Sequence, residues 1–117
     1  MTDPSGDRLT FLRYQREARK TADQGMIHTM PWLAHDGLKL AGEAGECTEL
    51  IGKWLRGDFD QATLRHRIRA ELGDVLWYLA QVATELGLDL DDIAEANLVK
   101  LYDRLDRDKL HGDGDSR

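Results

Sequence analysis

Four acidic residues form two pairs with the same spacing along the chain. Glu43 and Glu46 make the first pair, and Glu71 and Asp74 make the second. Residues three apart on a helix have Cβ atoms about 5–6 Å from each other. Two such helices packed antiparallel at roughly 8–10 Å would bring the four carboxylates together. Carboxylate oxygens are preferred ligands of hard divalent cations such as Mg²⁺, and a cation would offset the repulsion between them.

A helical wheel places both pairs at the border of an apolar stripe. With Glu43 at zero, the apolar residues of its segment fall between roughly −20° and 100°, and Glu46 lies about 60° further round. Glu71 and Asp74 have the equivalent placement on their own segment, with Tyr78 between them. A single acidic pair on a helix is usually a solvated surface, as Glu49 is expected to be. The repetition of the pair at two core borders favours a metal centre.

The elements that would position these acids are helical, because no segment shows sustained strand alternation. The predicted fold is all-α, a four-helix antiparallel bundle. Asp60 and Asp89 are expected to cap the third and fourth helices, while Gly57 and Gly87 end the second and third. Gly25 and Pro31 punctuate a predicted loop. The expected helices span residues 6–22, 35–56, 61–86 and 90–107, the loop spans 23–34, a single domain covers 1–110, and 111–117 form a flexible tail.

Composition narrows the possible functions. The 117 residues carry a net charge of −6, which disfavours binding to the phosphate backbone of nucleic acids. There is one cysteine, Cys47, so an internal disulfide is excluded and the residue is expected in the core. The N-terminus shows no apolar signal sequence, and no apolar run approaches the roughly 18 residues of a membrane span. These features predict a cytoplasmic protein that does not act at a membrane.

Basic and aromatic residues provide candidates for substrate contacts. Lys100 and Arg104 share a stripe with Asn97 on the fourth helix, which suits a polyphosphate but is also common on ordinary surfaces. Trp32 precedes the acidic helix and is the best candidate to stack on a nucleobase, although tryptophans are more often core or interface anchors. His35 is a candidate to approach a ligand, with a neutral structural role as the alternative.

The segment "AGEAGE", residues 41–46, places two glycines inside the predicted acidic helix. Each glycine costs a helix interior roughly 1 kcal/mol relative to alanine. On the wheel, Gly42 and Gly45 lie away from the apolar stripe. We therefore expect close approach of another backbone behind the acids, from the first helix, the preceding loop or a partner subunit.

The stretches "GLKLAGEAGECTELI" and "RAELGDVLWYLAQVA" resemble the MazG-like all-α nucleoside triphosphate pyrophosphohydrolases. The resemblance rests on Glu-x-x-Glu followed by Glu-x-x-Asp, here Glu43, Glu46, Glu71 and Asp74. "EANLVKLYDRLDR" resembles the Asn-x-x-Lys helix of that family, and "YQ" at 14–15 is a weaker signal. One departure is Gly42, where many members carry a glutamate. The resemblance covers nearly the whole chain.

The resemblance implies hydrolysis of nucleoside or deoxynucleoside triphosphates between the α and β phosphates, giving the monophosphate and pyrophosphate, as nucleotide-pool housekeeping. It implies a homodimer or homotetramer whose acidic quartet holds Mg²⁺, with Mn²⁺ as a substitute. The quartet would be catalytic, and Glu46 would orient or deprotonate a water that the metal activates. The implied substrate contacts are Asn97 and Lys100, and we add Trp32, His35, Tyr78 and Arg104 as candidates.

Two alternatives use the same residues differently. A carboxylate-bridged di-iron bundle requires Glu-x-x-His pairs, and no histidine here has a glutamate three residues before it. A non-catalytic helical interaction module remains open, and it predicts neither metal dependence nor stabilisation by nucleotides.

Overall fold

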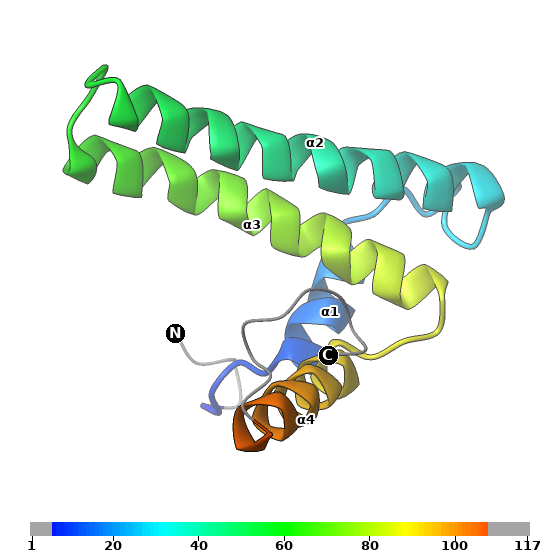
Figure 1. Cartoon of the computed structure of the whole chain (residues 1–117). Coiled ribbons are helices and arrows are strands. Elements are labelled where there is room, and N and C mark those ends of the chain that lie inside the picture. The colour runs from blue at the N-terminus through cyan, green and yellow to red at the C-terminus, as the bar shows by residue number, and fades with distance from the viewer. Residues whose placement is uncertain (1–5, 108–117) are drawn as a thin grey trace.

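The computed structural model describes residues 6–107, which fold into four helices and contain no β-strand. The helices are α1 (Phe11–Arg19), α2 (Met30–Leu55), α3 (Gln61–Glu85) and α4 (Leu90–Asp106). Helices α2 and α3 form a long antiparallel hairpin, while α1 and α4 pack together on the side of α3 that faces away from α2 (Figure 1). The predicted all-α class is confirmed. The predicted tail at 111–117 lies outside the described residues.

Two helix starts differ from the prediction, and the cause is the same in both. Helix α1 was predicted from Gly6 and begins at Phe11, because Thr10 caps it by accepting a hydrogen bond from the backbone N–H of Arg13. Helix α2 was predicted from His35 and begins at Met30, because Thr29 accepts from the backbone N–H of Trp32.

Pro31 was interpreted as a loop residue within the predicted loop at 23–34, and this interpretation was wrong. It lies in the first turn of α2, where a backbone N–H has no partner inside the helix and a proline costs nothing. The correction matters for function, because Trp32 becomes part of the helix that carries Glu43 and Glu46.

Helix α1 ends at Arg19, three residues before the predicted end, whereas the ends of α2, α3 and α4 and the starts of α3 and α4 lie within one residue of the prediction. Asp60 caps α3 by accepting from the backbone N–H of Thr63. Hydrogen bonds from the side chain of Thr63 and then from its backbone lower the pKa of the Asp60 carboxyl. Asp89 stands at the N-cap of α4 without a side-chain capping bond. Gly57 and Gly87 follow α2 and α3 with φ of +85° and +69°, the left-handed conformation that ends a helix most readily at glycine.

Gln15 fastens α1 to the turn between α3 and α4. Its side chain is buried; the amide donates to Thr84 Oγ1 at 2.9 Å and to the Leu88 carbonyl at 2.8 Å. Its carbonyl oxygen accepts from the backbone N–H of Leu90 at 2.8 Å. The "YQ" signal in the sequence thus includes a residue that joins three elements.

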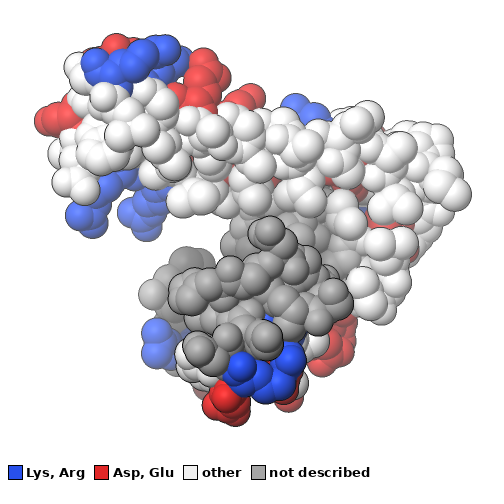
Figure 2. All heavy atoms as spheres, viewed as in Figure 1, with Lys and Arg blue, Asp and Glu red and all other residues white. Residues whose placement is uncertain are grey.

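The hydrophobic core within one chain is small. The buried apolar residues are mostly small, and they are Ala18, Ala22, Cys47, Leu64, Ala80, Ala83 and Leu90. By contrast Leu38 is 77% exposed and Leu55 is 71% exposed, both on α2. Uncharged surface covers much of the hairpin face in Figure 2. The radius of gyration is 17.1 Å, whereas about 13 Å is expected for a compact domain of this length.

Candidate metal centre

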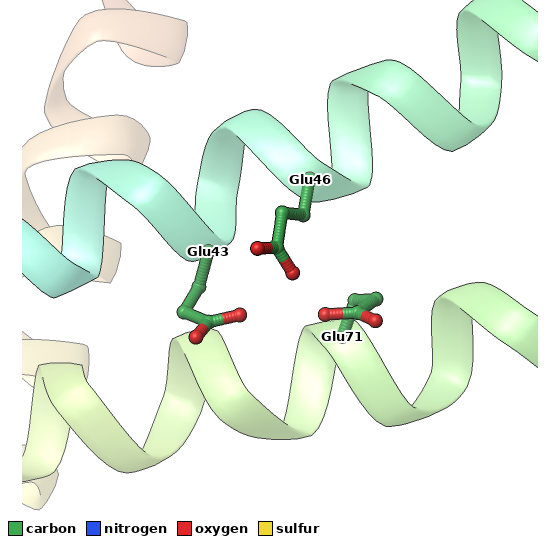
Figure 3. Close-up of side chains that lie close together, drawn as sticks. All are labelled: Glu43, Glu46 and Glu71. Carbon is green, nitrogen blue, oxygen red and sulfur yellow. The ribbon is translucent and has the colours of Figure 1, made fainter.

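Three glutamates from the two hairpin helices converge at the middle of the hairpin. Glu43 and Glu46 extend from α2 and Glu71 from α3, and their carboxylates point toward one another (Figure 3). One oxygen from each lies within 4.8 Å of the others. The side chain of Glu43 is only 12% exposed, whereas Glu46 faces solvent. The wheel prediction of converging carboxylates is confirmed for these three residues.

The electrostatics of this cluster are unfavourable without a cation. The pKa of Glu71 is raised, first by a hydrogen bond shared with Glu46, then by partial desolvation and by the charges of Glu46, Glu43 and Asp74. Glu43 Oε2 is buried and has no hydrogen-bond partner among the described residues. Lys39 Nζ lies 3.9 Å from the other oxygen of Glu43. An unpaired buried oxygen within a set of carboxylates fits a hard divalent cation such as Mg²⁺.

Asp74 is placed differently from the other three acids. It lies one turn from Glu71 on α3 and is exposed, but its carboxylate is outside the group of converging oxygens. Burial raises the pKa of the Tyr14 phenol on α1, and the charge of Asp74 raises it further. Asp74 therefore acts electrostatically on Tyr14, on the side of α3 that faces α1, as well as on Glu71.

Aromatic side chains lie next to the glutamates along the hairpin. Trp32 and His35 stack with ring centroids 5.2 Å apart, and the Tyr78 ring lies 6.2 Å from His35. Lys39 joins this group to the acids, because its Nζ is 6.0 Å from the Tyr78 centroid and also close to Glu43. The structure thus brings together the three aromatic residues that the sequence singled out.

Asp36 and Gln81 are buried polar residues that the sequence analysis missed. Both are fully buried, and Asp36 Oδ1 lies 3.2 Å from Nδ1 of His35. Burial raises the pKa of Asp36, while the contact with His35 opposes the rise. Contacts between Glu46 and Glu71 and between Lys39 and Tyr78 set an antiparallel register that places Asp36 opposite Gln81. The missed signal was the helical spacing of Asp36, Lys39 and Glu43, which all lie within the predicted helix at 35–56.

The predicted phosphate contacts on α4 are not near the glutamates within one chain. Asn97 lines an apolar pocket of about 210 Å³ together with Phe11, Leu76 and Ile93. Arg104 is 3% exposed, and Lys100 is half-buried. Helices α2 and α4 lie on opposite sides of α3 (Figure 1). A single chain does not join these residues to the carboxylate cluster.

The two glycines of "AGEAGE" have open surroundings. A Cβ built at Gly42 or Gly45 would meet no heavy atom of the described residues within 4 Å. The expected approach by the first helix or by the preceding loop is therefore wrong. A partner subunit is the remaining expectation for that surface.

Comparisons with known proteins identify the family of the chain. The family model described as the MazG nucleotide pyrophosphohydrolase domain matches residues 37–107. The Gene 37 protein of Mycobacterium phage L5 is 38% identical over 109 residues, which cover 89% of this chain and 96% of the phage protein. The chain belongs to the MazG nucleotide pyrophosphohydrolase domain family.

No solved structure gave a significant match. Within residues 6–107, no helix combines the length and the apolar character needed to cross a membrane.

Proposed function

We propose that this chain is an Mg²⁺-dependent nucleoside triphosphate pyrophosphohydrolase that cleaves between the α and β phosphates. The observation that carries the proposal is the cluster of Glu43, Glu46 and Glu71, in which three carboxylates converge and one buried oxygen of Glu43 has no hydrogen-bond partner among the described residues. One nearby cation, Lys39 at 3.9 Å from Glu43, does not balance three carboxylates, and the cluster therefore suits a divalent cation. Membership of the MazG family supports the nucleotide substrate. The substrates would be ribo- or deoxyribonucleoside triphosphates, and the products the monophosphate and pyrophosphate.

The acidic residues would have two roles, metal binding and activation of water. Glu43, Glu46 and Glu71 would hold the ion, and Asp74, one turn along α3, would join them through a change of its side-chain rotamer, since its carboxylate lies outside the converging oxygens. Bound Mg²⁺, or Mn²⁺ in its place, supplies positive charge against the triphosphate and acidifies water. Glu46, the solvent-facing member, would orient the attacking water and accept its proton.

The aromatic group next to the acids would receive the nucleoside. Trp32, His35 and Tyr78 offer ring faces for a base, and Lys39 stands between these rings and Glu43. A triphosphate that spans from the rings to the glutamates would pass Lys39, whose ammonium group suits phosphate oxygens. Lys39 therefore joins the predicted substrate contacts.

A second copy of the chain would complete the site. The small core and the exposed leucines on α2 leave apolar surface that a homodimer, or a homotetramer of dimers, would bury. Asn97 and Lys100 would then contact phosphate from the partner's α4, since α4 of the same chain lies across α3 from the cluster. Arg104 is not proposed as a contact, because it is only 3% exposed. The cell compartment would be the cytoplasm and the role nucleotide-pool housekeeping.

The exposed apolar surface also suits a non-catalytic helical interaction module, so the decisive experiment measures products. The protein is incubated with each common ribo- and deoxyribonucleoside triphosphate, with Mg²⁺, with Mn²⁺ and with chelator, and the products are separated. Equal amounts of monophosphate and pyrophosphate that require the metal are expected for at least one substrate. Complete absence of pyrophosphate across the panel, with folded protein, would favour the interaction module.

A further inference from the structure

A buried glutamate at the end of α3 holds the loop that leads into α2. Both oxygens of Glu85 accept from the backbone N–H of His28, at 2.9 and 3.1 Å. The Glu85 side chain is only 4% exposed. These bonds join positions 57 residues apart in the chain, so Glu85 fixes the loop between α1 and α2 directly to α3.

Arg19, the last residue of α1, completes this clamp. Its Nη2 donates to Glu85 Oε1 at 3.1 Å, and its Nη1 donates to Gln81 Oε1 at 2.8 Å. The Arg19 side chain is only 14% exposed, so both partners of the ion pair are largely removed from water. A buried pair of this kind is costly to break, since the remaining charge stays buried without its partner. The clamp therefore joins the ends of α1 and α3 to the loop between α1 and α2.

The held loop residue has an unusual backbone conformation. His28 has φ of +65°, the only positive φ at a non-glycine residue among those described. Side chains with a Cβ adopt this left-handed region at a cost, so surrounding contacts must compensate for it. The imidazole is exposed and lies 3.9 Å from Glu85 through Nδ1, whereas the short contacts use the backbone N–H. The clamp acts on the backbone conformation itself.

The residues that follow His28 in the chain begin helix α2, which carries Trp32 and His35. Thr29 caps α2 immediately after His28, and the N–H that it accepts from belongs to Trp32. Trp32 in turn stacks on His35, one turn further along α2. A change in the backbone at His28 would therefore shift the first turn of α2 and both rings. Glu43 and Glu46 lie more than two turns further on, where α2 pairs with α3 independently of the loop.

We propose that Glu85 and Arg19 are positioning residues for the nucleoside end of the active site. They do not touch the carboxylate cluster in the described contacts, and they act by setting the start of α2 through His28. This inference rests on the proposed function, because it assigns the base to Trp32 and His35. It separates two properties of the site: affinity for the nucleoside depends on the clamp, and metal binding does not.

The test compares Glu85→Ala and Glu85→Gln with wild type and with Glu17→Ala, a control that removes an exposed glutamate paired with Lys20. For the best substrate, Glu85→Ala should raise KM about 10-fold, as expected for the loss of buried hydrogen bonds. Its kcat should stay within about 2-fold, because chemistry at the metal is unchanged. Glu85→Gln keeps an acceptor for the His28 N–H and should restore most of the affinity. Calorimetric Mn²⁺ affinity should be equal in all four proteins.

Two changes at His28 test the backbone argument without touching Glu85. His28→Gly allows the left-handed conformation freely and keeps the N–H, so KM should stay within about 2-fold of wild type. His28→Val places a β-branched side chain at positive φ and should raise KM as Glu85→Ala does. Thermal unfolding of every variant shows that the protein is folded at the assay temperature.

The outcomes distinguish the inference from the function on which it rests. Wild-type protein without pyrophosphate release from any nucleotide would remove the proposed function. If the wild type is active, an unchanged KM in Glu85→Ala, or a loss confined to kcat and Mn²⁺ affinity, would overturn the positioning role. A lower unfolding temperature with an unchanged KM would likewise show that the clamp only stabilises the fold.

Discussion

The hairpin places glutamates in two different environments, a buried ion pair at Glu85 and a cluster of three carboxylates with Lys39 as the one nearby cation that the described contacts give. Glu85 is buried against Arg19 and accepts two bonds from a backbone N–H. Glu43, Glu46 and Glu71 face one another, and a buried oxygen of Glu43 has no hydrogen-bond partner among residues 6–107. Glu85 is satisfied within the chain, whereas we infer that the cluster needs a cation to offset the repulsion between its carboxylates. The same type of side chain has a structural role at Glu85, and we propose a ligand-binding role for it in the cluster.

The crowding of carboxylates in the cluster also changes the titration of Glu71. A hydrogen bond with Glu46, then partial desolvation and the charges of the neighbouring acids, raise the pKa of Glu71. A divalent cation and a proton compete for such a site. Removal of an acid should thus weaken metal binding and, in the metal-free protein, relieve repulsion.

The largest effect is expected on activity. Glu43→Gln and Glu71→Gln each remove a negative ligand while keeping the side-chain volume, and each should lower kcat/KM about 100-fold or more. Glu49→Gln is the matched control on α2, because Glu49 is exposed and pairs with Lys53 at 3.0 Å. Pyrophosphate release at saturating Mg²⁺ is the measurement. Activity near that of wild type in a folded Glu71→Gln protein would show that the cluster is not the active site.

A large effect on stability is expected when the buried ion pair between Arg19 and Glu85 is broken. Arg19→Met leaves the Glu85 carboxylate buried without its ion-pair partner, which should lower the free energy of unfolding by about 3 kcal/mol. Arg16→Met is the control, because Arg16 is exposed on the same helix. Denaturant unfolding followed by circular dichroism gives the values. Equal stability of the two variants would mean that Glu85 does not depend on Arg19.

A smaller effect, an increase in stability, is expected when Glu71 is replaced by glutamine in the absence of metal. Its folded-state pKa lies above the ordinary value of 4.5, so between these two values the folded protein binds more protons than the unfolded chain. Stability contributed by the protonated form is present at low pH and is lost as the pH rises through this window. Glu71→Gln cannot lose that proton, and it should unfold at a higher temperature than wild type at pH 7 in chelator.

The measurement is thermal unfolding from pH 4 to pH 8 for wild type, Glu71→Gln and Glu49→Gln. The difference between wild type and Glu71→Gln should grow as the pH rises, while Glu49→Gln should follow wild type. A variant that is less stable than wild type at pH 7 would contradict the repulsion inferred for the cluster.

The sequence was informative where chemistry repeats at helical spacing. Glu43, Glu46 and Glu71 could be predicted because an acid at an apolar border is unusual and because it occurs on both hairpin helices. The fold class followed from the same periodicity. Trp32 was identified, but the start of its helix was misplaced, since Pro31 suits both a loop and a first helical turn.

The clamp could not be predicted from the sequence. Glu85, Arg19 and His28 lie on three separate elements, and nothing in their local spacing indicates contact. A left-handed φ at His28 depends on tertiary hydrogen bonds rather than on residue type. The position of α4 was also beyond local patterns, because Asn97 and Lys100 have suitable spacing but lie across α3 from the glutamates within one chain.

Direct titration of the metal provides the clearest test of the central claim, that the converging glutamates are a divalent-cation site. Calorimetry with Mn²⁺ and Mg²⁺ compares wild type, Glu71→Gln, Glu85→Gln and Glu49→Gln in the absence of nucleotide. The account predicts that Glu71→Gln weakens Mn²⁺ binding at least about 10-fold while the other two variants bind as wild type does. Equal affinity in wild type and Glu71→Gln, or no binding by any of the proteins at millimolar Mn²⁺, would contradict it.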